Sequence, residues 1–171
     1  MPENLSRSQL VAVDANVLFD LVIGTEDVVD AVSLIRQRIR NTRFVIPPTV
    51  QQELANWASQ TDAPDKRAAA YQAIRFAHSA QIVPTDPITY SSNFANQVAK
   101  RVRDLGLIPE TEIHDSLIIV ECALLGCSLL LTSDEHLRAI DFERLAFELQ
   151  RFDISPPLIA TPREIVHKFF S

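Results

Sequence analysis

Short apolar runs alternate along this chain with longer stretches of helical periodicity, and this alternation restricts the possible folds more than any other feature. The runs are nearly continuous in apolar residues, as is typical of strands covered on both faces. They occupy residues 10–14, 44–46, 82–83, 128–131 and 158–160. Repeated strand–helix alternation favours parallel strands with helices packed against the sheet. The sequence therefore predicts an α/β fold, a three-layer α/β/α sandwich around a mostly parallel central sheet of about five strands.

The helical stretches have recognisable ends. Apolar residues recur at helical spacing between 27 and 40, which predicts a helix there. Thr49 and Gln52 are spaced as a capping box, so the helix after the second strand is expected to begin at Thr49. Residues 161–164 form a second capping box, with Pro162 at the first helical position, and predict a terminal helix. Other expectations are helices at 66–79, 89–105 and 111–125, a polar loop at 60–65, and one or two helical turns within 135–150.

The composition indicates a single cytoplasmic domain spanning residues 1–171. Apolar residues make up 47% of the 171 positions, enough for a sizeable core. No apolar stretch approaches the roughly 18 residues that a membrane span needs, and the polar N-terminus has no signal-peptide core. Cys122 and Cys127 have apolar neighbours and lack a metal-binding spacing, so we expect two buried thiols. The net charge of −6 disfavours a protein that coats nucleic acid through its overall field.

Four carboxylates follow strands or begin helices in this pattern. Asp14 and Asp134 follow apolar strands, and Glu53 and Asp115 lie in the early turns of helices. In open parallel sheets, ligands bind beyond the carboxyl ends of the strands, so these four side chains are expected at one edge. Acids held together there need a counter-charge, and carboxylate oxygens suit Mg²⁺ or Mn²⁺. The sequence therefore predicts a metal site built from these acids.

Several neighbouring residues are further candidates. Glu112 lies one helical turn before Asp115 and is either an additional ligand or base, or a solvated acid. His114 is a candidate proton shuttle, while His136, Asp20 and Asp141 are interpreted as surface or capping residues. Trp57 is interpreted as a core or interface residue rather than a base-stacking platform. Three basic groups are either solvated helix faces or phosphate contacts for RNA: Arg36, Arg38, Arg40 and Arg43; Lys66 and Arg67; Lys100, Arg101 and Arg103.

In order and spacing, four motifs make the chain resemble the PIN-domain nucleases. They are VDANVL at 13–18, PTVQQEL at 48–54, HDSLIIVECAL at 114–124 and LTSDEHL at 131–137, and the ending IATPRE at 159–164 also fits. The resemblance implies a five-stranded parallel sheet and a Mg²⁺- or Mn²⁺-dependent endoribonuclease. Asp14, Glu53, Asp115 and Asp134 would then be the metal-binding acids. Asn16 and Ser133 occupy positions where the family often has small polar residues that orient the acids.

The resemblance also implies an RNA substrate and a homodimer, and many relatives are toxins inhibited by a small antitoxin protein. Two other functions compete with this one. A PIN-like module could bind RNA or a protein with weak or no cleavage. A haloacid-dehalogenase-like phosphatase also begins with an Asp after an apolar strand, but it needs a second Asp where this chain has Asn16. The stretch 60–105 carries none of the motifs, and no role is assigned to it.

Overall fold

The computed structural model describes residues 8–60, 62–86 and 91–170, and its strands form one parallel sheet. The strand order is β3-β2-β1-β4-β5, and every described pair runs parallel. The α/β class, the five strands and the parallel arrangement expected from the sequence are thus confirmed. The strands are β1 (Gln9–Val13), β2 (Thr42–Ile46), β3 (Val83–Pro84), β4 (Leu129–Leu131) and β5 (Leu158–Ala160).

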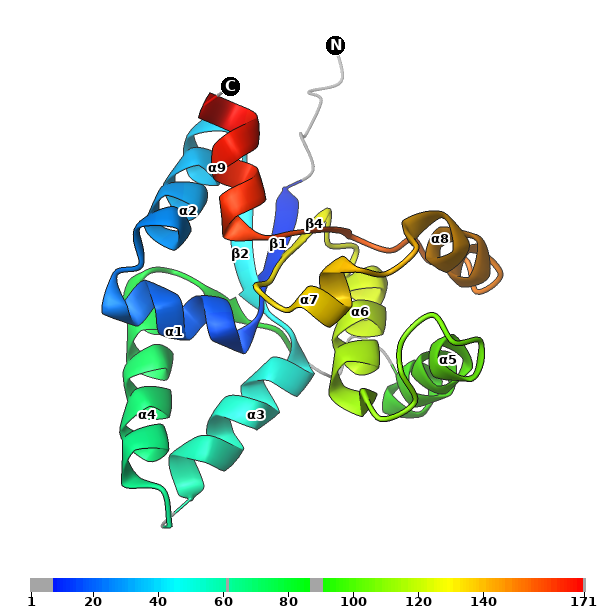
Figure 1. Ribbon diagram of the computed structural model, residues 1–171, viewed down its shortest axis with the longest axis horizontal. Coiled ribbons are helices and arrows are strands. Elements are labelled where there is room, and N and C mark those ends of the chain that lie inside the picture. The colour runs from blue at the N-terminus through cyan, green and yellow to red at the C-terminus, as the bar shows by residue number, and fades with distance from the viewer. Residues whose placement is uncertain (1–7, 61, 87–90, 171) are drawn as a thin grey trace.

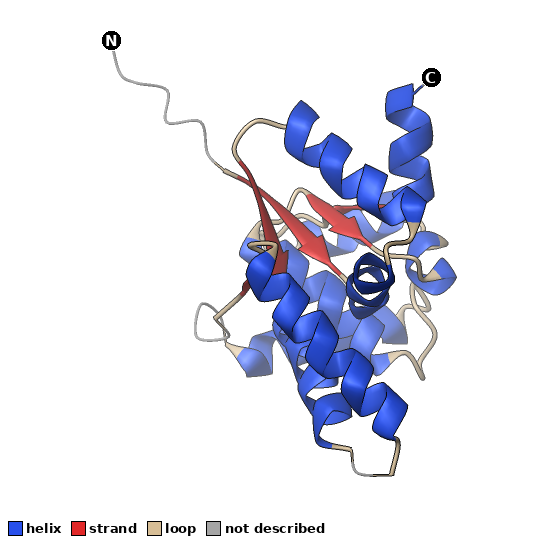
Figure 2. Cartoon of the chain, turned by 90° about the vertical axis from the view of Figure 1, so that its left-hand side faces the viewer, coloured by secondary structure: helices blue, strands red, loops and turns tan. Residues whose placement is uncertain are grey.

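Helices cover both faces of the sheet, which gives the predicted three layers. In Figure 1 the strands lie between α1, α2, α3, α4 and α9 on the left and α5, α6 and α8 on the right. Figure 2 shows the strands from the left-hand side, fanned by the usual sheet twist. The helices are α1 (Ala15–Ile23), α2 (Glu26–Arg38), α3 (Pro48–Ser59), α4 (Pro64–Ser79), α5 (Ser92–Asp104), α6 (Ile113–Leu125), α7 (Glu135–Arg138), α8 (Phe142–Gln150) and α9 (Pro162–Phe170).

The core lies between the sheet and its helices. Val11, Ala12 and Val13 of β1 and Leu130 and Leu131 of β4 are fully buried. Central parallel strands covered on both faces produce this continuous burial, which explains their unbroken apolar sequence. The Cys122 and Cys127 thiols are free and buried, as expected. Within the described ranges, no helix has both the length and the apolar character needed to cross a membrane.

Several helix boundaries differ from the sequence-based prediction. The helix α1 was not predicted, although Asp14 caps its start and Gly24, with φ of 75°, ends it. The prediction of one or two turns within 135–150 was too short, since α7 and α8 both lie there. Helix α6 begins at Ile113 rather than Thr111. The predicted start of the helix at 89–105 falls partly on 87–90, outside the described residues, and α5 is described from Ser92.

The predicted capping role of Thr49 was wrong. Helix α3 begins at Pro48, with Pro47 in the cap position, so Thr49 already lies inside the first turn. Two successive prolines fix φ near the helical value and remove amide donors that would otherwise need a cap. The Thr49 hydroxyl is therefore free to bind elsewhere, and it donates to Glu121. By contrast, the capping box at Thr161 and Glu164 forms as predicted, with reciprocal hydrogen bonds.

Candidate metal centre

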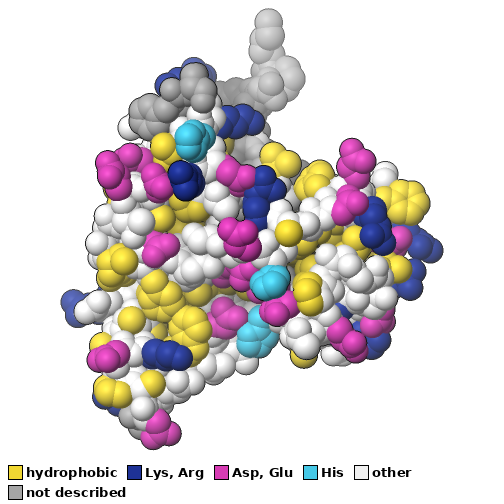
Figure 3. All heavy atoms as spheres, viewed as in Figure 1, with side chains coloured by type: hydrophobic (Ala, Val, Ile, Leu, Met, Phe, Trp, Pro, Cys, Tyr) yellow, Lys and Arg dark blue, Asp and Glu magenta, His cyan; other side chains and the backbone are white. Residues whose placement is uncertain are grey.

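The candidate site lies where the carboxyl ends of β1 and β4 meet the N-terminal turns of α3 and α6. Figure 3 shows Asp, Glu and His side chains gathered in the middle of this face, between the two groups of helices. All four predicted acids come from elements that end or begin here. The tertiary structure thus brings together carboxylates that are spread over most of the sequence.

Asp14 is the most tightly held acid of the four. It is only 6% exposed and follows β1 directly, at the N-cap of α1. Its carboxylate accepts hydrogen bonds from the Ala15 N–H (2.7 Å), the Thr132 hydroxyl (2.7 Å) and the Asn16 amide (3.3 Å). Burial raises the pKa of Asp14 above its ordinary value, although these hydrogen bonds oppose the shift. Asp14 is therefore fixed in position but unfavourable as an isolated anion.

Thr132 connects Asp14 to Asp134. Its fully buried hydroxyl donates to Asp14 and accepts the Asp134 backbone N–H at 3.0 Å. Asp134 caps α7, with Oδ1 accepting from the His136 N–H at 2.7 Å. Sequence reasoning missed Thr132, although a hydroxyl residue directly after a buried strand was a usable signal.

Asn16 and Ser133 contribute differently from each other. Asn16 donates to Asp14 and accepts the Ser133 backbone N–H at 3.1 Å, so it links the loops after β1 and β4. Ser133 takes part through its backbone, while the hydroxyl that reaches Asp14 belongs to Thr132. The orienting side chains at this edge are therefore Asn16 and Thr132.

Glu53 and His114 form a direct contact between α3 and α6. The Glu53 Oε1 atom lies 2.8 Å from the His114 Nδ1 atom. Burial raises the pKa of Glu53, with a smaller contribution from Asp14, and the contact with His114 opposes this. The His114 ring is mostly exposed and reaches Glu53 from the rim. His114 therefore touches one of the candidate ligands, a contact that its sequence position did not reveal.

Asp115 is the least satisfied acid of the group. Its Oδ2 atom is buried and has no hydrogen-bond partner among the described residues. The pKa of Asp115 is raised to about 7. Burial is the largest cause, and the negative charges of four neighbouring acids add to it: Asp134, Asp14, Glu112 and Glu53. These contributions place the other four acids within electrostatic range of Asp115. Glu112 occupies the N-cap position of α6 and adds to the negative charge around Asp115.

The donor set fits a hard divalent cation. Such ions bind carboxylate oxygens, and a bound cation would neutralise several like charges and satisfy the unpaired oxygen of Asp115. Within the described ranges, no three His, Cys, Asp or Glu side chains are already gathered at metal-binding spacing. The residues present have the chemistry to hold Mg²⁺ or Mn²⁺.

A cavity of about 800 Å³ lies elsewhere in the molecule. It is found at the β3 edge, where Phe44, Ile74, Ile82 and the Arg36 side chain contribute to its lining. None of the candidate acids lines this cavity. The carboxylates instead lie at the carboxyl edge of the sheet, away from this cavity.

Other candidate residues have structural partners. Arg36 donates to the Ala80 carbonyl and lies over the Phe44 ring, and Lys100 pairs with Asp104. Arg103 donates to the Ser116 hydroxyl next to Asp115. These contacts favour the structural interpretation for those three bases.

Three residues interpreted as packing, capping or surface residues behave in that way. The Trp57 ring stacks on Phe19 with centroids 5.3 Å apart, which agrees with a packing role. Asp141 caps α8 by accepting the Arg144 N–H at 3.1 Å, and His136 is exposed.

Comparison with known families agrees with this geometry. The family model described as "PIN domain" matches residues 11–143, which is most of the chain and includes all four acids. The chain belongs to the PIN-domain family. No curated protein matches it by sequence.

Two solved structures resemble this PIN-domain protein in fold. One is a chain of VapBC2 from Rickettsia felis, crystallised with a DNA fragment from their promoter, with a TM-score of 0.60 and 13% identity. The other is a chain of VapBC-1 from nontypeable Haemophilus influenzae, with a TM-score of 0.54 and 16% identity. Each match covers 90% of this chain and 98% of the other. At such low identity, the likeness establishes a shared fold.

Proposed function

We propose that this PIN-domain protein is an endoribonuclease that hydrolyses RNA phosphodiester bonds with Mg²⁺ or Mn²⁺ held by Asp14, Glu53, Asp115 and Asp134. The observation that carries the proposal is the buried, unpartnered Asp115 Oδ2 atom inside a cluster of mutually destabilised carboxylates. Such clusters with strongly shifted pKa values are more typical of functional sites than of structural ion pairs. Membership of the PIN-domain family and the matching motifs support the same assignment.

When bound, the cation would lower the pKa of a water nucleophile and neutralise charge developing on the phosphodiester. Neighbouring residues hold two of these acids in place through hydrogen bonds. Thr132 and Asn16 hold Asp14, and the His136 N–H holds Asp134. Asp115 would have an oxygen available to the cation, because no described residue donates a hydrogen bond to its Oδ2 atom.

The proposal extends to partners and setting. The solved structures that share the fold are chains of VapBC complexes, which supports a small antitoxin protein as a partner of this chain. By family resemblance we also propose a single domain over residues 1–171, a homodimer and action on RNA in the cytoplasm.

The test is cleavage of a panel of single-stranded and structured RNAs by the purified full chain, with Mn²⁺ or with chelator. Asp115→Asn and Asp14→Asn are expected to remove metal-dependent cleavage while the far-UV circular dichroism spectrum stays unchanged. Asp141→Asn, which keeps a cap on α8 away from the site, is the matched control and should cleave like the wild type. Cleavage by Asp115→Asn at the wild-type rate would overturn the proposal. RNA binding without cleavage by the wild type would favour a PIN-like binding module.

A further inference from the structure

Most of the buried polar side chains of the described chain belong to two hydrogen-bonded pairs. One pair, Asp14 and Thr132, is part of the candidate metal centre. The other, Thr49 and Glu121, includes no proposed ligand and lies on α3 and α6. Burying a carboxylate is unfavourable unless hydrogen bonds compensate for the lost water. The presence of Glu121 inside an otherwise apolar helix face therefore calls for a specific role.

Glu121 holds the first turn of α3 at two points. It is only 6% exposed, and its Oε2 atom accepts the Thr49 backbone N–H at 3.0 Å. Its Oε1 atom accepts the Thr49 hydroxyl at 2.7 Å. Amides in the first turn of a helix have no partner within the helix, and the helix dipole favours a negative charge there. The contact joins residues 72 positions apart and fastens α3 to α6.

The two helices joined in this way are those that carry Glu53 and Asp115. Thr49 lies about one helical turn before Glu53, and Glu121 lies less than two turns after Asp115. Helices transmit position along their length because their backbone is rigid over such short distances. We propose that Glu121 is a positioning residue, which acts through Thr49 to set the separation of Glu53 and Asp115 for metal binding. This inference rests on the proposed metal centre.

The arrangement has a counterpart on the other side of the centre. Thr132 joins Asp14 and Asp134 through its hydroxyl, and so connects the ends of β1 and β4. In the same way, the hydrogen bonds between Thr49 and Glu121 connect α3 and α6. The two acids of each pair thus lie on elements that a buried threonine joins. Supporting hydrogen bonds behind metal ligands generally contribute to affinity, because they reduce the rearrangement needed on binding.

Four substitutions separate this role from a general effect on folding. Glu121→Ala removes both contacts, and Thr49→Val removes only the hydroxyl contact. Glu121→Gln keeps two contacts, since its amide oxygen accepts the Thr49 N–H and its NH₂ group donates to the hydroxyl oxygen. Thr49→Ser keeps the hydroxyl. Leu149→Ala, in the buried face of α8, is the control for a destabilised core, because it leaves the contact between Thr49 and Glu121 in place.

The measurement is Mn²⁺ affinity of the full chain, by isothermal titration calorimetry and by electron paramagnetic resonance of free Mn²⁺. Glu121→Ala is expected to raise the Mn²⁺ Kd about 10–100-fold. Thr49→Val should raise it by a smaller factor, and it serves as the test if Glu121→Ala fails to fold. Glu121→Gln, Thr49→Ser and Leu149→Ala should bind Mn²⁺ with a Kd close to that of the wild type, because these variants keep a hydrogen-bonded contact between positions 49 and 121. Asp115→Asn reports on the centre itself and should lose binding.

The outcomes are distinguishable. A wild-type Kd in both Glu121→Ala and Thr49→Val, with binding lost in Asp115→Asn, overturns the positioning role and leaves the metal centre intact. An equal loss of affinity in Leu149→Ala also overturns it, because general destabilisation would then explain the effect. Absence of Mn²⁺ binding in the wild type overturns the metal centre and this inference together.

Discussion

The ionised form of Asp115 is unfavourable, because its buried Oδ2 atom has no hydrogen-bond partner among the described residues and several negative charges lie nearby. Its folded-state pKa of about 7 lies above the ordinary value of 3.8, so the folded, metal-free chain binds this proton more tightly than the unfolded chain. Between these two values the unfolded state has lost the proton and the folded state has kept it. Stability without metal therefore falls as pH rises from about 3.8 to about 7, and then levels off.

Asp115→Asn is accordingly expected to stabilise the metal-free protein at pH 8 and to give little gain at pH 4. A rise of the Asp115 pKa from 3.8 to about 7 corresponds to about 4 kcal/mol, but solvent reaches part of this side chain, so we expect about 1–2 kcal/mol. Urea unfolding in chelator at both pH values measures it. If Asp115→Asn raised the free energy of unfolding equally at pH 4 and pH 8, the gain would not come from ionisation of Asp115.

Thr132 is the second residue whose loss should be informative. Thr132→Val keeps the shape but leaves the buried Asp14 oxygen and the Asp134 N–H without this partner. An unsatisfied buried polar group costs about 1–3 kcal/mol, so the free energy of unfolding should fall by that amount. Metal-dependent cleavage should fall as well, because both acids lose a common support. Thr132→Ser is the matched control, and equal behaviour of the two variants in denaturant unfolding and cleavage would contradict the role of the hydroxyl.

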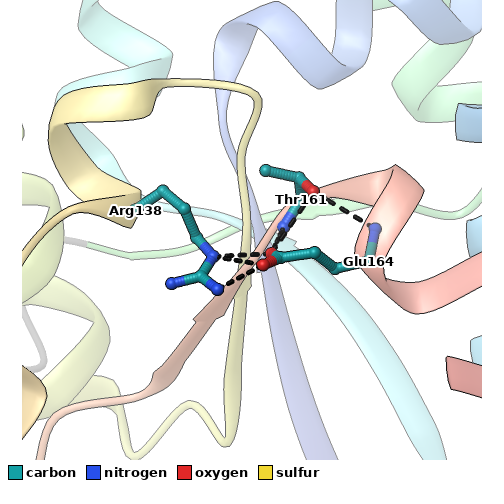
Figure 4. A network of polar contacts seen from close by, with 3 residues as sticks. All are labelled: Arg138, Thr161 and Glu164. Atoms are coloured by element: carbon teal, nitrogen blue, oxygen red, sulfur yellow. Dashed lines mark hydrogen bonds and ion pairs between the residues drawn. The ribbon is translucent and has the colours of Figure 1, made fainter. Parts of the chain in front are cut away.

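At the scale of elements, the short helix α7 is tied to the start of α9. Figure 4 shows the Arg138 guanidinium paired with Glu164, whose carboxylate also accepts the Thr161 N–H in the capping box. The hydrogen bonds from Arg138 hold the pKa of Glu164 at about 2, below its ordinary 4.5. Since Asp134 caps α7 and Arg138 ends it, this pair fixes the far end of the helix that begins at a proposed ligand.

Arg138→Ala should lower the free energy of unfolding by about 0.2–1 kcal/mol at pH 7, because the pair is largely exposed and screened by solvent. Glu164 has a depressed pKa, so its contribution is present above pH 4.5 and is lost as pH falls toward 2. Glu164→Ala should cost more than Arg138→Ala, since it also removes the capping box. Unfolding in low salt and in 1 M salt measures both variants. A salt-independent effect of Arg138→Ala would show that packing, not charge, is responsible.

At the scale of the whole molecule, metal binding should stabilise the fold by mass action. A ligand present at 100 times its Kd adds about 2.7 kcal/mol to the free energy of unfolding. For a chain of this size, 1 kcal/mol shifts the Tm by about 2–4 °C, so Mn²⁺ should raise the Tm by about 5–10 °C. Thermal unfolding with Mn²⁺ and with chelator measures the difference. An equal rise in Asp115→Asn would indicate that Mn²⁺ binds outside the proposed centre.

Much of the fold could be predicted because its signals are local. The unbroken apolar runs identify buried parallel strands, and the glycine and capping-box patterns identify several helix ends. The prediction failed at Thr49. The spacing of Thr49 and Gln52 matches a capping box, but the Thr49 hydroxyl donates to Glu121, which is distant in the sequence, and does not cap α3. Helix α1 was missed because Asp14 was interpreted chiefly as a metal ligand after a strand, although it also caps the helix that follows.

The sequence by itself determined the parallel α/β architecture and showed that the four candidate acids follow strands or begin helices, because strand periodicity and residue type are properties of short segments. Which side chains support those acids was decided only by the tertiary structure. The Thr132 contact with Asp14 spans 118 positions, and the contact of His114 with Glu53 spans 61. Residues so far apart come into contact only when the sheet order and helix packing are fixed. No short sequence pattern predicts such a contact. The same holds for the raised pKa of Asp115, which comes from burial and from the charges of four acids, of which only Glu112 is close in the sequence.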